Sequence, residues 1–168
     1  MVPHIYSRVK RHVLEVRFTE GMDADAGITL VKKYGRVDLV RAMIKSDRFE
    51  QRVTAAHVIA ALQLWECWDD LYKVVKDRGS RGGFEALMAL MDLSPWPPEK
   101  EAEMVDLVMK DGTGEVAAQA TVVLLSRMES GQLVSRAFAK AVLRSMSNTQ
   151  HGPLREQKVQ RLRTLLEE

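Results

Sequence analysis

The fold is decided by RVTAAHVIAALQLWECWDDLYKVVKD, residues 52–77, because this stretch repeats the one before it. Moving AGITLVKKYGRVDLVRAMIK, residues 26–45, forward by 31 positions places apolar residues on apolar residues and a lysine on a lysine. The pairs are Ile28 with Ile59, Val31 with Leu62, Tyr34 with Trp65, Val37 with Trp68, Val40 with Leu71, Ile44 with Val75 and Lys45 with Lys76. Within each stretch the apolar residues recur at three- and four-residue steps, which is typical of amphipathic α-helices.

Two further shifts extend the repeat toward the C-terminus. A shift of 34 carries the second half of residues 52–77 onto EKEAEMVDLVMK, residues 99–110, and another shift of 34 places Lys110 on Arg144. A period of 31 to 34 residues with two helices in each period predicts helical hairpins that stack on one another. Each hairpin would bury its apolar face only against its neighbours.

Glycines and prolines separate the apolar-periodic segments along the whole chain. The segments predict helices over residues 4–19, 24–34, 36–46, 49–64, 67–77, 82–92, 98–110, 114–128, 132–147 and 153–167. No segment alternates apolar and polar residues in the manner of a strand, so the predicted fold class is all-α.

Residues 52–77 resemble a HEAT repeat of the short type found in phycobilisome-lyase-like proteins. The stretch has an Arg-Val opening, an alanine-rich first helix ending in Ala-Leu, and a second helix of the form Leu-x-x-Val-Val-Lys-Asp. It departs from the pattern at Trp65, because the turn of the family pattern has a small residue at this position. The next unit departs from the pattern at Gly82 and Gly83. The resemblance implies an armadillo-like α-solenoid, a right-handed α-α superhelix of about four degenerate hairpins, and it implies no catalytic residue.

The expected organisation is a single domain over residues 1–168. Residues 1–20 and 152–168 would be terminal capping helices. The hairpins between them would be residues 21–47, 48–78, 79–111 and 112–147. A chain of this length is long enough to bury a substantial core.

Composition and charge narrow the classes of protein. The net charge is only +2, but it is distributed as +4 over residues 1–81, −5 over residues 82–111 and +3 over residues 112–168. An acidic middle disfavours a groove that follows a nucleic-acid backbone over its full length. The single cysteine cannot form an internal disulfide, and no apolar run approaches the roughly 20 residues that cross a bilayer, so a cytoplasmic protein without membrane contact is expected.

The segment LQLWECWDD, residues 62–70, invites a functional interpretation because it holds two tryptophans, the only cysteine and three carboxylates. The repeat offers a structural one: Trp65 and Trp68 fall on apolar positions that flank a hairpin turn, where large side chains fill the junction between repeats. A ligand-stacking platform is the alternative. Asp69 and Asp70 are expected near the start of a helix, where carboxylates complement the helix dipole, and Cys67 is expected to be a half-buried thiol rather than a nucleophile or metal ligand.

Basic residues recur at the repeat period and form the candidate partner-binding site. They are Lys45, Lys76, Lys110 and Arg144, joined by Arg41 and Lys73 on the same predicted helices. Each of the first four ends a second helix, and the repeat geometry predicts that they align along one edge. They either complement the C-termini of their own helices or form a basic column that docks an acidic peptide or isolated phosphates.

The remaining motifs indicate no reaction. The four histidines lack metal-ligand spacing, His57 is expected in the core or a groove, and DRGSRGG, residues 77–83, lacks the Lys-Ser/Thr ending of a phosphate-binding loop. We therefore expect no catalytic residue, cofactor or metal, and a non-enzymatic adaptor or scaffold that binds a protein or peptide on the concave solenoid face. The alternative is a nucleic-acid-binding protein related in fold to HEAT-like alkylpurine DNA glycosylases. The oligomeric state is open.

Overall fold

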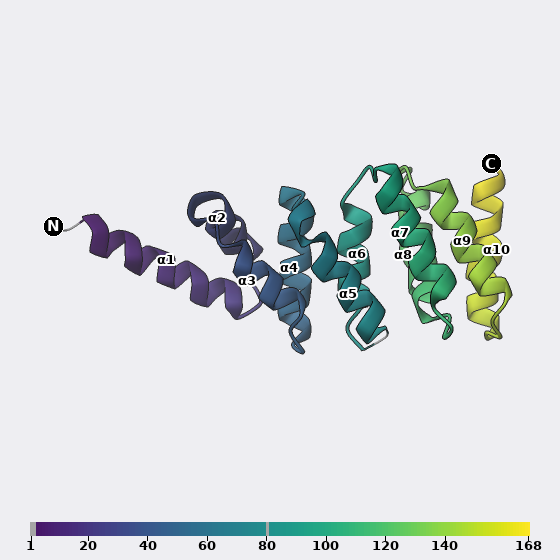
Figure 1. The fold of residues 1–168 in the computed structure, drawn as a ribbon, viewed down its shortest axis with the longest axis horizontal. Helices are drawn as coiled ribbons and strands as arrows, with labels where there is room; N and C mark the ends of the chain where they lie inside the picture. The colour runs from purple at the N-terminus through teal and green to yellow at the C-terminus, as the bar shows by residue number, and fades with distance from the viewer. Residues whose placement is uncertain (1–2, 80) are drawn as a thin grey trace. The chain divides into compact units, whose positions relative to one another are not determined.

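The computed structural model describes residues 3–79 and 81–168 of the 168-residue chain, with side chains from residue 5 onward. Their regular structure is helical, with no strand in the described part of the chain (Figure 1). The elements are α1 (Pro3–Thr19), α2 (Ala24–Tyr34), α3 (Val37–Ile44), α4 (Phe49–Leu62), the 3-10 helix η1 (Trp65–Cys67), α5 (Trp68–Arg78), α6 (Phe84–Asp92), α7 (Pro98–Lys110), α8 (Glu115–Glu129), α9 (Arg136–Ser147) and α10 (Pro153–Glu167). The predicted all-α class and all ten predicted helices are confirmed.

The predicted and observed helix ends differ most at α9, which was expected to begin at residue 132. The hydroxyl of Ser135 accepts a hydrogen bond from the backbone N–H of Phe138 at 3.1 Å and caps the helix there. The preceding turn contains Gly131 in the left-handed region, with φ at 74°. A serine N-cap therefore defines this helix start more strongly than the apolar period does.

The chain divides into two compact units, Met1–Ser94 and Pro95–Glu168, which we call unit 1 and unit 2. The boundary falls in the proline-rich segment 94–98. Consequently α6 belongs to unit 1 and α7 to unit 2, although the sequence repeat assigns both to one hairpin. The predicted single domain stays a prediction.

In unit 1 the helices form two layers. Helices α2, α4 and α6 pack side by side in one layer, while α3 and α5 contact each other in the second layer and pack on α4 and α6 respectively. Leucine, isoleucine and valine side chains from both layers are fully buried, among them Leu30, Ile44, Ile59, Leu71 and Leu87. Helix α1 packs on α2 through Phe18, and a Cβ on Gly27 would lie 2.4 Å from the Phe18 ring. Only glycine permits this close approach.

Unit 2 repeats the layered pattern with fewer helices. Helix α8 packs on α10 and helix α7 packs on α9, while α8 and α9 join the two pairs. The core contains Met104, Leu124, Phe138 and Leu162, all completely buried. Trp96 meets the Phe138 ring edge to face, with the ring centroids 5.2 Å apart.

The end of α4 has an unusual backbone conformation. Gln63 is the one non-glycine residue with positive φ, at 50°, within residues 3–79 and 81–168. Its amide nitrogen donates to the carbonyls of Ala60 and Asp92, both at 2.9 Å, and its amide oxygen accepts from the N–H of Ser94 at 3.3 Å. The bonds with Asp92 and Ser94 join the end of α4 to the end of α6, and all three together offset the strain of a left-handed residue that is not glycine.

Within the described residues, no helix is both long enough and apolar enough to span a bilayer.

Candidate interaction surfaces

The basic residues that recur at the repeat period do lie at helix ends. Lys76, Lys110 and Arg144 occupy the last turns of α5, α7 and α9, and Lys45 directly follows α3. Lys45 and Lys76 belong to unit 1, whereas Lys110 and Arg144 belong to unit 2. The helix-end positions are therefore confirmed, and a single column of all four side chains stays a prediction.

Two candidate residues of α3 are bound to one carboxylate of α5. Arg41 Nε lies 3.3 Å from Asp70 Oδ2, and Lys45 Nζ pairs with Asp70 Oδ1. Arg41 also donates to the carbonyl oxygen of Glu66 at 2.6 Å. Asp70 was expected to complement the dipole of its own helix, and it lies in that first turn. It also joins α3 to α5, which the sequence did not indicate.

Two other lysines of this candidate site, Lys73 and Lys110, have carboxylates on their own helices. Lys73 donates to Asp77 Oδ2 at 2.6 Å, and Lys110 donates to Asp106 Oδ2 at 2.9 Å, in both cases four residues apart. The hydrogen bond from Lys73 lowers the pKa of Asp77 below its usual value, with a smaller contribution from the charge of Lys76. Such exposed pairs contribute little to helix stability, because water screens them.

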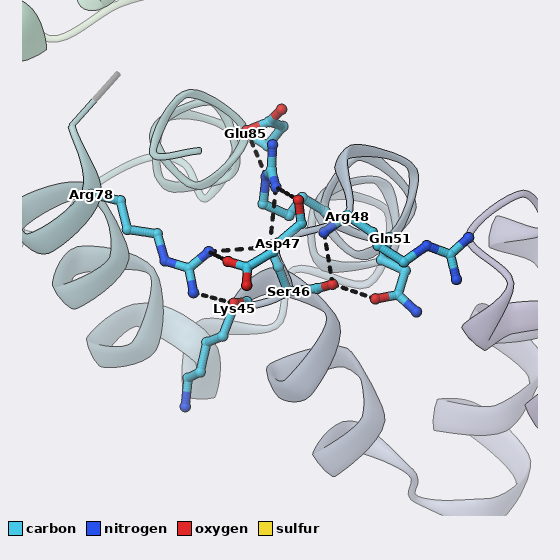
Figure 2. Close-up of polar contacts among 8 residues, drawn as sticks. Lys45, Ser46, Asp47, Arg48, Gln51, Arg78 and Glu85 are labelled. Atoms are coloured by element: carbon cyan, nitrogen blue, oxygen red, sulfur yellow. Dashed lines mark hydrogen bonds and ion pairs between the residues drawn. The ribbon is translucent and has the colours of Figure 1, made fainter. Parts of the chain in front are cut away.

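The turn after α3 is held by an arginine that sequence reasoning did not select (Figure 2). Arg78, at the end of α5, donates to the carbonyl oxygens of Lys45 and of Ser46, the latter at 3.1 Å, and lies 3.3 Å from Asp47 Oδ1. The last carbonyls of a helix have no partner within the helix. Arg78 therefore caps α3 from the next hairpin, and this is the role we had expected of Lys45.

A second arginine reaches the same turn from inside the protein. Arg52 of α4 is buried and donates to the carbonyls of Ser46 at 3.1 Å and Asp47 at 2.9 Å, while its Nε lies 3.3 Å from Glu85 Oε2 on α6. The side chains of this ion pair are only 10% and 8% exposed. Gly82 allows the guanidinium to lie against the backbone, because a Cβ there would come within 3.2 Å of Arg52 Cζ. Ser80 of the same connector lies outside the described residues.

The tryptophan segment is mainly structural. Trp68 and Cys67 are buried, and the Trp65 and Trp68 rings stack with centroids 5.7 Å apart and an angle of 14° between planes. Trp65 itself is partly exposed, so it fills the expected junction between repeats less completely than Trp68 does. Burial raises the pKa of the Cys67 thiol, and the nearby Arg41 opposes this rise only in part. A thiol that resists ionisation is a poor nucleophile and a poor metal ligand.

Unit 1 has an open groove between α4 and α6. Its volume is about 100 Å³, and its lining residues are Val53, Ala56, His57, Ala60, Glu85, Met88 and Asp92. The floor is apolar, Met88 is 38% exposed, and His57 is exposed at the surface. Phe49, one turn before Val53 on α4, is 60% exposed. The sequence predicted that His57 lies in the core or in a groove. It did not indicate an apolar groove between α4 and α6, which are the first helices of successive repeats.

Unit 2 has a shallower depression beside the α8–α9 loop. Met128, Leu133, Val134 and Leu165 contribute its apolar atoms, and Leu133 is completely exposed. It is also lined by Arg136, whose guanidinium donates to the carbonyl of Leu166 at 3.0 Å.

No group of three metal-binding side chains occurs within residues 5–79 and 81–168. His151 forms its ring contacts with Glu156 at 2.6 Å and with the carbonyl of Thr149 at 2.9 Å. The hydroxyl of Thr113 accepts a hydrogen bond from the N–H of Glu115 at 3.2 Å and donates to Asp111 at 2.7 Å, while Gly114 occupies the cap position. Asp111 Oδ2 accepts from the N–H of Val116 at 2.8 Å. The start of α8 is therefore held chiefly by Asp111.

Comparison with known proteins gives no relative. No protein-family model, no curated protein and no solved structure matches this chain.

Proposed function

We propose that this protein is a non-enzymatic adaptor that binds a segment of another protein, and that the α4–α6 groove of unit 1 receives its apolar side chains. The observation that carries the proposal is the groove itself. Val53, Ala56, Ala60 and Met88 give it an apolar floor, and His57 and Asp92 are among its lining residues. An open apolar groove with a few polar groups is typical of binding sites for peptide side chains.

The proposal includes the repeat architecture. A HEAT-like α-solenoid agrees with the 31-residue repeat and with the two helical layers found in each unit. Such folds generally supply extended binding surfaces, but a fold by itself does not specify a partner, so the groove and not the fold supports the function. A cytoplasmic location rests on the single cysteine.

The basic second-helix surface predicted from the sequence is the weaker binding surface within this proposal. Arg41 and Lys45 already share Asp70, and Lys73 has Asp77. The exposed Lys76 leaves this surface with excess positive charge, which would favour acidic residues flanking an apolar anchor. We expect it to affect the rate of association more than the affinity.

Peptides selected from a displayed library on the immobilised full-length protein test the groove. Met88→Glu places a charge in the groove, and Met109→Glu in α7 of unit 2 is the matched control, since Met88 is 38% exposed and Met109 is 40% exposed. Met88→Glu should weaken the selected peptides by about tenfold or more, and Met109→Glu should leave their affinity unchanged. Equal binding to both variants, with circular dichroism unchanged, contradicts the proposal.

The nucleic-acid alternative is tested on the same preparations. Binding to heparin that collapses with modest added salt, together with no selectable peptide, would favour that alternative.

A further inference from the structure

Helix α1 carries an apolar face that the protein does not cover. All side chains of residues 5–13 are exposed, and burial begins at Leu14 and becomes complete at Phe18. In Figure 1 the first half of α1 runs away from α2 and lies beside no other helix of unit 1. A short helix without tertiary packing is marginally stable in water, so a partner for this half would stabilise it.

The exposed apolar side chains have the spacing of a helix–helix seam. Tyr6, Val9, Val13 and Val16 follow one another at steps of three, four and three residues, and each is more than 40% exposed. With about 100° of rotation per residue, this seam lies on the side of α1 opposite Leu14 and Phe18. Steps of three and four residues define the a and d positions of a coiled coil.

The residues beside the seam determine the charge of its partner. In this register the e positions are Lys10 and Arg17, and the g positions are Ile5 and His12. No carboxylate stands at either position. Arg17 pairs with Asp23, whereas within the described residues neither Arg8 nor Lys10 forms an ion pair, and Lys10 Nζ lies 4.5 Å from the centre of the Tyr6 ring.

This pattern favours one occupant over two others. A second copy of α1 would place Lys10 and Arg17 against the same residues in an antiparallel pair, so like charges would meet. A membrane surface prefers tryptophan, phenylalanine and leucine on a broad apolar face, and this seam is narrow and contains tyrosine and valine. Glutamates beside the seam of a partner helix would complement the basic e side of α1, formed by Lys10 and Arg17.

We infer that the outer face of α1 docks an amphipathic helix of a partner protein, with an apolar seam flanked by acidic residues. Residues 5–16 span about 18 Å of helix, which matches roughly three turns of the partner. The inference adds a second surface to the proposed adaptor function. Because it depends on α1 and not on the α4–α6 groove, either one can fail while the other holds.

The test uses fluorescently labelled peptides of about three heptads with leucine or isoleucine at a and d. One peptide has glutamate at e and g, a second has lysine there, and a third is a scrambled version of the acidic peptide. Fluorescence anisotropy with the full-length protein should show binding of the acidic peptide, weakened by added salt, and affinities at least about tenfold lower for the other two.

Two variants and a control make the result specific. Val9→Ser with Val13→Ser should weaken the acidic peptide by about tenfold or more, while Val122→Ser in unit 2, at a site as exposed as Val16, should have no effect. Lys10→Glu with His12→Glu should reverse the preference toward the lysine peptide. Circular dichroism confirms that each variant is folded.

Three outcomes overturn the inference. Equal binding of the acidic and scrambled peptides shows that charge alone is recognised. Sedimentation could show a concentration-dependent dimer. If the double variant Val9→Ser, Val13→Ser abolishes that dimer, the face binds a second copy of this chain. The protein could also cosediment with vesicles of anionic lipid. If the same double variant loses this binding, and the acidic peptide does not bind, the face of α1 binds a membrane.

Discussion

In unit 1 the turn after α3 is held by guanidinium groups, whereas in unit 2 the turn before α8 is held by a carboxylate. Arg52 and Arg78 donate to backbone carbonyls at the C-terminal end of α3, and Asp111 accepts backbone N–H groups at the N-terminal end of α8. Each group complements the dipole of the helix end it binds. We call these the arginine clamp and the aspartate clamp.

The two clamps differ in reach, and this difference matters more than their charge. Arg78 is 33 residues from Lys45, whose carbonyl it binds, so the arginine clamp joins successive hairpins. Asp111 is five residues from Val116, so the aspartate clamp fixes one local turn. Losing the first should therefore weaken the association of hairpins, and losing the second should loosen only the start of one helix.

The largest expected effect is that of Arg52→Met. It leaves the Glu85 carboxylate buried without its partner, and we expect a loss of about 3–5 kcal/mol in the free energy of unfolding, measured in urea. Arg52→Met combined with Glu85→Met removes both charges and should cost clearly less than Arg52→Met alone. If the single variant loses less than about 1 kcal/mol, the buried ion pair is not important for unit 1.

Arg78→Ala should come next. Its side chain is 28% exposed, so solvent replaces part of what is lost, and we expect a decrease of about 1–2 kcal/mol. Amide hydrogen exchange should accelerate both in residues 43–48 and in α5, because the clamp connects them. Acceleration in α5 alone would mean that Arg78 does not couple the two hairpins.

Asp111→Ala should cost about 1 kcal/mol, as is typical of a lost N-terminal cap. Faster hydrogen exchange should be confined to the first turn of α8, and Asp111→Asn should retain most of the stability since an amide oxygen can still accept. Faster exchange that spreads into α9 or α10 would break the comparison, because the aspartate clamp would then also act at long range.

Changing Lys45, Lys76 and Arg144 together to glutamine should lower the unfolding free energy by about 1 kcal/mol or less. Their side chains lie at helix ends that other groups already hold, as Arg78 does for α3. Peptides selected on the α4–α6 groove should bind this variant with nearly unchanged affinity. A loss of tenfold or more in a folded variant would instead make the basic residues the main binding site.

The smallest effect concerns pH. A hydrogen bond from Arg36 lowers the pKa of Asp38 below its usual value, so the pair stabilises the folded state above the pKa of the unfolded state. This contribution is lost as the pH falls through the lowered value. Asp38→Asn should therefore flatten the acid limb of the stability curve by well under 1 kcal/mol, since Asp38 is 64% exposed. Arg36 also pairs with Glu15 of α1, so an unchanged acid limb would show that Arg36 acts mainly on that second carboxylate.

The sequence predicted those features that depend on neighbours along the chain. The apolar period placed every α-helix though not the 3-10 helix η1, and the repeat identified Trp68 as a junction residue, which the structure buries. Local polar chemistry was harder to read. At the start of α8 the hydroxyl of Thr113 accepts the N–H of Glu115, and the longer side chain of Asp111, two residues earlier, reaches the N–H of Val116.

The candidate interaction surfaces were less predictable because they depend on contacts about one repeat apart. In residues 52–77, Arg52 was noted only as part of the Arg-Val opening of a HEAT-like repeat. Nothing in the sequence indicated that Glu85, 33 residues later, is its partner. The candidate lysines had a regular period, yet a period does not show which carboxylate binds each of them. The α4–α6 groove arises from side chains of two helices whose packing the sequence alone does not give.

The turn at residues 45–48 has a consequence for how unit 1 shares its stability. It ends the hairpin of α2 and α3, it is bound by Arg52 and Arg78 from the hairpin of α4 and α5, and Arg52 continues to Glu85 on α6. In a one-dimensional repeat model, bonds of this kind add to the nearest-neighbour coupling rather than to the intrinsic stability of any hairpin. Strong coupling of this kind makes partly unfolded states of unit 1 rare. A ligand that bound one hairpin would therefore stabilise the other hairpins of unit 1 as well.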